Sequence, residues 1–305
     1  RPDGYVGKPA DAGTDVFAMD TGASSSTIPN FDSGFPVDWA YDRAVSGANW
    51  DIGARLIEGQ YLNGNDPGAQ GIWAPNSFDS NVGWNHNGAG SGSQSWMWKR
   101  GQSFDVVCYE GTGGNQTINH GLNKVPEMMV SKGRTFSDWY GVYHKDIGIE
   151  KYLRMNTSNG TYDNATIWQG TTPTSSVFYL GINQATNYNG HKHIIWMFAS
   201  VTGISKVGSY TGNGQTLSNG TYITTGFQPR FVLLKRSDGS GNWYVMDSLR
   251  GWGTPGQNTT NLYLNSSSSE NGSTLVEPDS TGFRVVDDSS QVNGNGNAYI
   301  YYAHA

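Results

Sequence analysis

His191 and His193 are the clearest candidates for metal chemistry in this sequence, because a single residue separates them. Side chains alternate along a β-strand, so both imidazoles would lie on the same face of a strand. A zinc site needs three or four ligands, and no Cys or Glu at a recognisable spacing completes the pair. We therefore interpret the two histidines as an exposed pair at a strand edge, and we expect no metal and no cofactor.

Aspartates in the C-terminal third could form a second kind of metal site. Asp238, Asp247 and the adjacent Asp287 and Asp288 carry the oxygen ligands that calcium prefers. None lies in a loop that alternates carboxylates with a glycine and ends in Glu, which is the signature of a calcium loop. Turn formation and hydrogen bonds to backbone N–H groups suit these aspartates equally well.

A catalytic carboxylate pair is also missing from the sequence pattern. Asp20-Thr-Gly resembles the triplet of aspartic proteases, in which two aspartates share one proton. The corresponding turns later in the chain start at Glu110 and Tyr210, so the aspartate is not repeated. Glycoside hydrolysis needs two carboxylates about 5–10 Å apart, and no pair stands out. We therefore expect that the protein is not an enzyme.

Two aromatic residues, Trp252 and Tyr188, are the candidates for ligand binding. Each lies in a polar, glycine-rich stretch, Arg250-Gly-Trp-Gly and Asn187-Tyr-Asn-Gly, without an obvious counterpart elsewhere in the chain. An exposed ring flanked by Asn and Gly suits stacking on a sugar face, with amide hydrogen bonds to the sugar hydroxyls. The alternative is that each ring folds back onto its own domain.

Other tryptophans recur at corresponding places along the chain. Trp50, Trp139 and Trp243 each follow one copy of a repeated tract, and Trp96 and Trp196 lie in apolar runs that close two of the copies. Recurrence in successive copies favours a role in the core over a role in binding.

The elements that position these residues come in three copies. Tracts at 34–43, 123–132 and 226–235 each combine a proline with an apolar run, and the first and third also contain aromatic residues. Their prolines are Pro36, Pro126 and Pro229. The period is about 100 residues, which is near the size of one small domain. We predict three tandem domains, at 1–103, 104–202 and 203–305. The joints are very short, so we expect a stiff rod or a compact stack.

The third copy gives the clearest indication of fold. It holds seven short runs rich in β-branched and aromatic residues, at 206–210, 221–225, 230–235, 243–246, 261–264, 282–286 and 298–303. Clusters of Gly, Asn, Ser and Asp separate them, and Asp238-Gly239 supplies the conformations that a tight hairpin turn needs. This pattern predicts an all-β protein of three antiparallel, jelly-roll-like β-sandwiches.

Composition excludes several classes of partner. The net charge is −6 and only 14% of residues are charged, which argues against nucleic-acid binding. No apolar run approaches the roughly 18–20 residues of a membrane span. Cys108 lies in a strand-like run, where we expect a buried, inert thiol. The chain starts at Arg1, so we expect a processed or truncated piece of something longer.

Motifs spread along nearly the whole chain resemble a family of tandem β-sandwich proteins, often described as concanavalin-like, of tailed phages of aquatic bacteria. They include Lys-Val-Pro-Glu-Met and Tyr-Thr-Gly-Asn-Gly, and they occupy 1–5, 104–111, 124–128, 138–139, 196–200, 209–214 and 226–232. The resemblance implies a virion-associated protein, either a tail fibre or a surface decoration. It brings no catalytic residue with it.

Together these observations predict a non-enzymatic structural protein of the virion surface, with possible contacts to host surface glycans through Trp252 or Tyr188. The expected partners are further copies of the chain in a homo-oligomer, a trimer by preference, other virion proteins and host polysaccharide. The alternative is a secreted carbohydrate-binding module or adhesin. A glycan-active enzyme is a third and weaker hypothesis.

Overall fold

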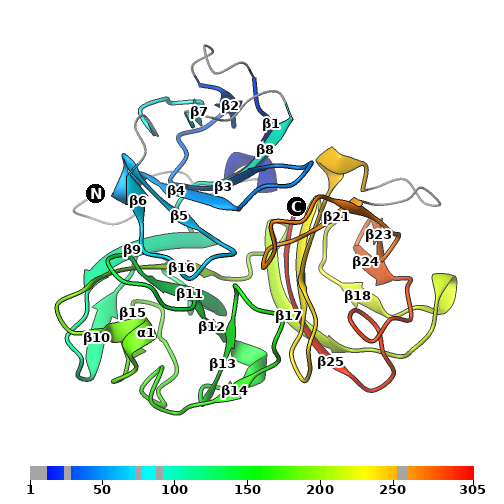
Figure 1. Cartoon of the computed structure of the whole chain (residues 1–305). Helices are drawn as coiled ribbons and strands as arrows, with labels where there is room; N and C mark the ends of the chain where they lie inside the picture. Colours follow the sequence, from blue (N-terminus) through cyan, green and yellow to red (C-terminus); the bar gives the residue numbers. More distant parts are fainter. Residues whose placement is uncertain (1–11, 24–28, 73–76, 87–91, 253–259) are drawn as a thin grey trace.

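The computed structural model describes residues 12–23, 29–72, 77–86, 92–252 and 260–305 (Figure 1). Within them the protein is all-β, as predicted, with antiparallel sheets, short 3-10 helices (η) and one four-residue α-helix. We refer to the parts that hold β1–β8, β9–β16 and β17–β25 as units 1, 2 and 3. All seven strands expected in the third copy are present.

The elements of each unit follow one another along the chain. Unit 1 contains η1 (Gly13–Asp15), β1 (Phe17–Thr21), β2 (Phe31–Asp32), β3 (Trp39–Ala44), β4 (Asp51–Ala54), η2 (Arg55–Ile57), β5 (Gln60–Asn63), β6 (Gly71–Ile72), β7 (Gly83–Trp84) and β8 (Ser93–Trp98). Unit 2 contains β9 (Phe104–Glu110), β10 (Gln116–Asn119), β11 (Met128–Gly133), β12 (Gly141–His144), η3 (Lys145–Ile147), β13 (Lys151–Arg154), β14 (Tyr162–Asp163), β15 (Val177–Leu180), α1 (Gln184–Asn187) and β16 (Lys192–Phe198). Unit 3 contains β17 (Ser205–Thr211), η4 (Leu217–Asn219), β18 (Tyr222–Thr224), β19 (Phe231–Arg236), β20 (Trp243–Asp247), η5 (Ser248–Arg250), β21 (Thr260–Tyr263), β22 (Asn271–Gly272), β23 (Val276–Asp279), β24 (Gly282–Val285) and β25 (Ala298–His304).

One sheet topology occurs three times. The six-stranded sheets have the orders β1-β8-β3-β4-β5-β6, β9-β16-β11-β12-β13-β14 and β17-β25-β19-β20-β21-β22. In each, the last strand of the unit lies between the first strand and an inner strand. A small sheet forms a second layer in each unit: β2-β7, β10-β15 and β18-β24-β23. Each unit is therefore a two-layer β-sandwich.

Strand register identifies the equivalent residues. Ala54, His144 and Asp247 pair with the first residue of β3, β11 and β19, respectively. The residues four positions before these three are Trp50, Tyr140 and Trp243, and all are buried. Trp50 and Tyr140 directly precede β4 and β12, and Trp243 is the first residue of β20. The sequence had matched Trp139 to Trp243, and this match is wrong by one residue.

Trp139 and Tyr140 lie on opposite faces of the sheet, because a shift of one residue along a strand moves a side chain to the other face. Trp139 is half-buried and stacks on Tyr152, with ring centroids 4.7 Å apart. It lies on the face of its sheet that packs against the core of unit 2. Trp96 and Trp196 are equivalent, as expected, and both are buried in the centre of the molecule.

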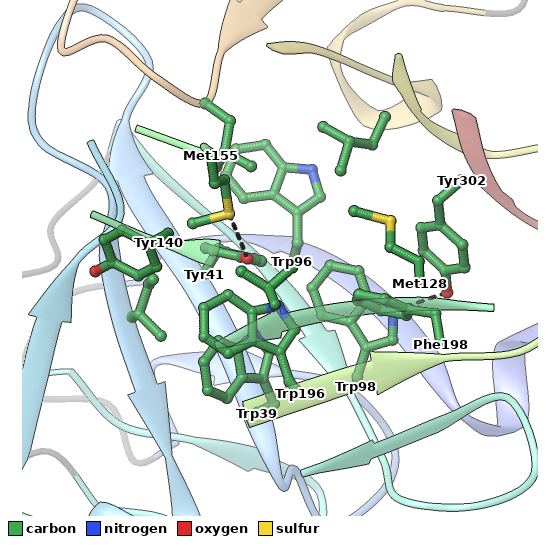
Figure 2. Close-up of a cluster of buried hydrophobic side chains, with 14 of the residues drawn as sticks. Trp39, Tyr41, Trp96, Trp98, Met128, Tyr140, Met155, Trp196, Phe198 and Tyr302 are labelled. Atoms are coloured by element: carbon green, nitrogen blue, oxygen red, sulfur yellow. Dashed lines mark hydrogen bonds between the residues drawn. The ribbon is translucent and has the colours of Figure 1, made fainter. Parts of the chain in front are cut away.

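Both faces of each large sheet are buried. On one face, Ala40, Met129 and Val232 pack into a core that belongs to their own unit. On the other face, their neighbours Trp39, Met128 and Phe231 join one large cluster drawn from all three units, in which Trp39 and Trp196 rings lie 4.2 Å apart (Figure 2). A cavity of only about 20 Å³ remains in this central core.

The units are therefore not arranged as a rod. Figure 1 shows the three large sheets around a common centre, with their central faces turned toward one another. The expectation of a rod assumed that each unit buries its own core. Instead each sheet buries a second apolar face against the other two units, and this arrangement removes far more apolar surface from water. The boundaries of the three domains, at 1–103, 104–202 and 203–305, remain predictions.

Buried cations connect the units in a closed cycle. Arg43, Lys132 and Lys235 are equivalent and at most 1% exposed. The Arg43 guanidinium of unit 1 donates to backbone carbonyls of unit 3, including Ser268 at 2.6 Å. Lys132 Nζ of unit 2 donates to Pro67 of unit 1 at 2.7 Å. Lys235 Nζ of unit 3 donates to Ser158 of unit 2 at 3.1 Å. Buried charges need such partners, so these bonds fix the three units relative to one another.

Candidate functional site

An aromatic patch on unit 2 contains Tyr188, one of the two predicted sugar-contacting residues. Tyr188 directly follows α1 and is 37% exposed. Its neighbour Asn187 anchors the turn, because Asn187 Nδ2 donates to the Gly181 carbonyl at 2.8 Å and its Oδ1 accepts from Thr112 N at 2.8 Å. The turn therefore holds the Tyr188 backbone in place.

The Tyr188 ring is held by two neighbouring rings. It stacks on His191, with centroids 4.3 Å apart and planes 11° from parallel, and meets Phe136 edge to face at 5.1 Å. Thr135 and Asn189 are exposed beside it. We call Thr135, Phe136, Tyr188, Asn189 and His191 the aromatic patch. His191 covers one face of the tyrosine, so a ligand would contact the other face or the edge.

His193 does not form the exposed pair with His191 that the sequence indicated. His193 is completely buried on β16, and its Nε2 accepts a hydrogen bond of 3.1 Å from Tyr188 N. Burial lowers the pKa of His193 to about 4, so the imidazole is neutral at pH 7. His191 is half-buried and bonds to Thr135 through Nδ1. The buried His193 imidazole therefore holds the backbone of Tyr188 in place through its Nε2 hydrogen bond.

Trp252, the other predicted sugar-contacting residue, is only 2% exposed. Its indole N–H donates to the Val276 carbonyl at 2.9 Å, and its ring packs into the core of unit 3. The expected exposed ring is thus wrong for Trp252, and the alternative of folding back onto its own unit is confirmed. Its glycine-rich surroundings were misleading because apolar contacts come from β23 and β24, which are distant in sequence.

The aspartates considered as calcium ligands have partners within the protein. Asp247 is fully buried and accepts from the Trp96 indole at 3.0 Å and from Arg250. Asp238 pairs with Arg236 at 2.7 Å. Among the described residues these carboxylates do not gather with Asp287 or Asp288 into a metal-binding group. Cys108 is half-buried, and burial raises the pKa of its thiol, which disfavours the reactive thiolate.

Unit 1 also contains a cluster of Asp42, Asp51 and His86 that the sequence pattern did not indicate. Asp42 on β3 lies directly opposite Asp51 on β4, so both carboxylates share the face that looks toward the small sheet. His86 follows β7 and stacks on Trp84 with ring centroids 5.8 Å apart. One potential ligand atom from each of the three residues lies within 4.8 Å of the others. Only strand register, which the sequence did not reveal, brings them together.

Burial and the neighbouring charges shift the pKa values of all three residues of the cluster. Burial raises the pKa of Asp42, and this effect outweighs the hydrogen bond of 2.7 Å between Asp42 Oδ2 and His86 Nδ1. Burial and the nearby Asp42 charge raise the pKa of Asp51 to about 7. Burial lowers the pKa of His86, but the two carboxylates reverse this and leave it above its ordinary value.

A groove of about 950 Å³ runs between units 1 and 2. Its walls carry charged side chains that already pair with one another: Arg55 with Asp38 at 3.2 Å, and Arg100 with Asp105. This pairing satisfies two of the charged pairs in the walls, while Lys99 also lines the groove.

Comparison with known proteins places the chain in a family. Residues 69–305 match a domain of unknown function, DUF7483, and because this match covers most of the chain, the protein belongs to that family. No curated protein matches the sequence, and no solved structure matches it. Within the part of the chain that the structure describes, no helix is long and apolar enough to cross a membrane.

Proposed function

We propose that the protein is a non-enzymatic structural component of a virion surface, either a tail fibre or a decoration of the capsid or tail. The observation that carries the proposal is the closed cycle of buried inter-unit bonds around one shared core, from Arg43, Lys132 and Lys235. These bonds make the three units a single stiff body, which suits a part that must survive outside a cell. The resemblance to phage β-sandwich proteins supports the same conclusion.

Attachment to host surface polysaccharide would use the aromatic patch. Tyr188 offers an exposed ring that is already held in position, so little side-chain entropy is lost on stacking against a sugar. Asn189 and Thr135 offer polar groups for the hydroxyls. Affinity at one shallow site would be low, and several copies on a particle would raise it through multivalency.

Assembly follows as part of the proposal: a homo-oligomer, with a trimer as the first expectation, or docking onto other virion proteins. Sheet edges are one ground for this expectation, because natural β-proteins cover or pair such edges. Each large sheet has one edge strand of two residues, β6, β14 or β22, and one longer edge strand of five to seven residues, β1, β9 or β17. Very short edge strands limit edge-to-edge pairing, whereas the longer ones are able to pair with another chain. Native mass spectrometry of the purified protein measures the number of copies directly.

The alternative function, a secreted carbohydrate-binding module or adhesin, uses the same patch without a particle. Immunogold labelling of purified particles separates the two functions, because the virion proposal requires the protein on the particles and its absence would contradict the proposal. Glycan-array binding by the wild type, by Tyr188→Ala and by Tyr222→Ala tests the patch. Tyr222 is 36% exposed on unit 3 and is a matched control. Only Tyr188→Ala should lose binding.

A further inference from the structure

The cluster of Asp42, Asp51 and His86 is not required by the fold. By strand register, the equivalents of Asp42 and Asp51 are Ser131 and Gly141 in unit 2. In unit 3 they are Leu234 and Tyr244. Two of the three units thus form the same sheet without any charge at these positions. The carboxylates of unit 1 therefore call for an explanation other than packing.

Placing two carboxylates opposite each other in a sandwich is unfavourable by itself. Like charges on directly opposed residues of antiparallel strands destabilise a sheet, and an ionised carboxylate loses solvation when it is buried. Asp42 is 2% exposed, and Asp51 is half-buried beside it. One imidazolium at His86 can balance only one of the two negative charges. The cluster therefore has room for a further positive charge.

A buried oxygen of Asp42 is independent evidence for a bound ligand. Its Oδ2 pairs with His86 Nδ1 at 2.7 Å, whereas its Oδ1 is buried and has no hydrogen-bond partner among the described residues. Buried polar atoms nearly always have a partner, so such an oxygen needs an explanation, and an absent ion is one. It belongs to a group whose ligand atoms already lie within 4.8 Å of one another.

We propose that Asp42, Asp51 and His86 bind one divalent transition-metal ion, for which Zn²⁺ is the best match. An imidazole with two carboxylates is a mixed ligand set that Zn²⁺ accepts, whereas Ca²⁺ and Mg²⁺ prefer oxygen ligands alone. The ion would connect β3 and β4 of the large sheet to the segment after β7 of the small sheet. It would thereby fasten the two layers of unit 1. This proposal replaces the earlier expectation that the protein binds no metal.

Titration of the EDTA-treated protein with Zn²⁺ in a calorimeter tests the proposal. The wild type should bind one Zn²⁺ per chain, and Zn²⁺ should raise its thermal unfolding midpoint, because a ligand that binds only the folded state stabilises it. Asp51→Asn keeps the shape and half-buried position of the side chain and should weaken Zn²⁺ binding at least tenfold. Asp163→Asn, at a carboxylate 87% exposed on unit 2, is the control and should bind like the wild type.

Co²⁺ provides a second readout that does not depend on stability. Coordination by the imidazole and carboxylates should give the wild type a visible absorption band that Asp51→Asn and His86→Gln lack, and circular dichroism confirms that each variant is folded. A wild type that shows neither stoichiometric Zn²⁺ binding nor a Co²⁺ band would overturn the proposal, and so would equal binding by Asp51→Asn. In either case a proton on Asp51, rather than a metal, would balance the charge.

Discussion

The indole N–H of Trp243 in unit 3 donates a hydrogen bond of 3.0 Å to the backbone carbonyl of Arg154 in unit 2. The equivalent residues repeat the bond around the molecule. Tyr140 Oη of unit 2 donates to the Asn63 carbonyl of unit 1 at 2.8 Å, and the Trp50 indole of unit 1 donates to the Tyr263 carbonyl of unit 3 at 2.8 Å. In each case the acceptor is the last residue of the strand next to the edge strand: Asn63 ends β5 beside β6, Arg154 ends β13 beside β14, and Tyr263 ends β21 beside β22. The three bonds close a ring.

Tyr140→Phe removes one bond of this ring and leaves the aromatic ring in place. The half-buried Asn63 carbonyl then keeps the Asp66 N–H, which donates to it at 3.1 Å. The free energy of unfolding should fall by about 1 kcal/mol, the net contribution of one hydrogen bond. Urea denaturation measures the change. Tyr222→Phe, whose hydroxyl bonds to Asp279 at the surface, is the control and should change stability much less. Equal losses in the two variants would show that the ring of inter-unit bonds contributes little.

Trp243→Ala and Trp139→Ala compare how much the two faces of a large sheet contribute to stability. Trp243 is 1% exposed in the central core, so its removal should cost about 3–5 kcal/mol. Trp139 is half-buried, and its loss should cost clearly less, although the repeated tryptophans had suggested similar roles. The midpoints of chemical denaturation give both values. A larger loss for Trp139→Ala would contradict the assignment of Tyr140 as the equivalent of Trp243.

Gly160→Ala tests the close approach of units 2 and 3. A Cβ atom at Gly160 would lie 2.9 Å from Gly239 N and 3.0 Å from the Ser237 carbonyl of unit 3. Backbone atoms cannot move aside as a flexible side chain can, so the variant should unfold at a distinctly lower temperature. At Gly101 an added Cβ meets nothing within 4 Å, which makes Gly101→Ala the control. An unchanged melting temperature for Gly160→Ala would mean that the contact is loose.

Acid should destabilise the protein through His193. Its pKa is 6.5 in the unfolded chain and about 4 in the folded protein, because burial disfavours the charged imidazole. Above pH 6.5 both states are neutral, and this contribution to stability is fully present. Between pH 6.5 and 4 the unfolded chain takes up a proton that the folded protein does not, so stability falls, by on the order of 3 kcal/mol.

His193→Gln removes that titration and keeps a side chain able to accept from Tyr188 N. The difference in unfolding free energy between wild type and variant should therefore shrink as the pH falls from 7 to 4. Urea denaturation at several pH values in this range measures it. Parallel pH profiles would show that His193 titrates alike in both states.

The sequence predicted the sheets well and their arrangement poorly. Strands such as β19 and β25 are rich in β-branched and aromatic residues, and their glycine-rich turns indicated antiparallel pairing. Those strands lack a polar face, however, so nothing in their pattern distinguishes a face buried within a unit from one buried between units. Trp39 and Ala40 are neighbours in the chain and enter different cores.

The candidate sites depended on contacts that a single sequence does not contain. Tyr188 could be predicted because its polar neighbours are adjacent in the sequence, and its ring is partly exposed in the structure. Trp252 has an equally polar loop, but distant strands cover it. Asp42 and Asp51 are nine positions apart and meet only through the register of β3 and β4.

Amide hydrogen exchange in wild type and Trp243→Ala tests the central claim, that three units share one core and unfold as one body. Peptides from β3, β11 and β19 report on units 1, 2 and 3. If the core is shared, Trp243→Ala should lower the opening free energy in all three strands by a similar amount, because the protected amides exchange through one global opening. A loss of protection confined to β19 and its neighbours, with β3 and β11 unchanged, would show three independent domains and contradict the claim.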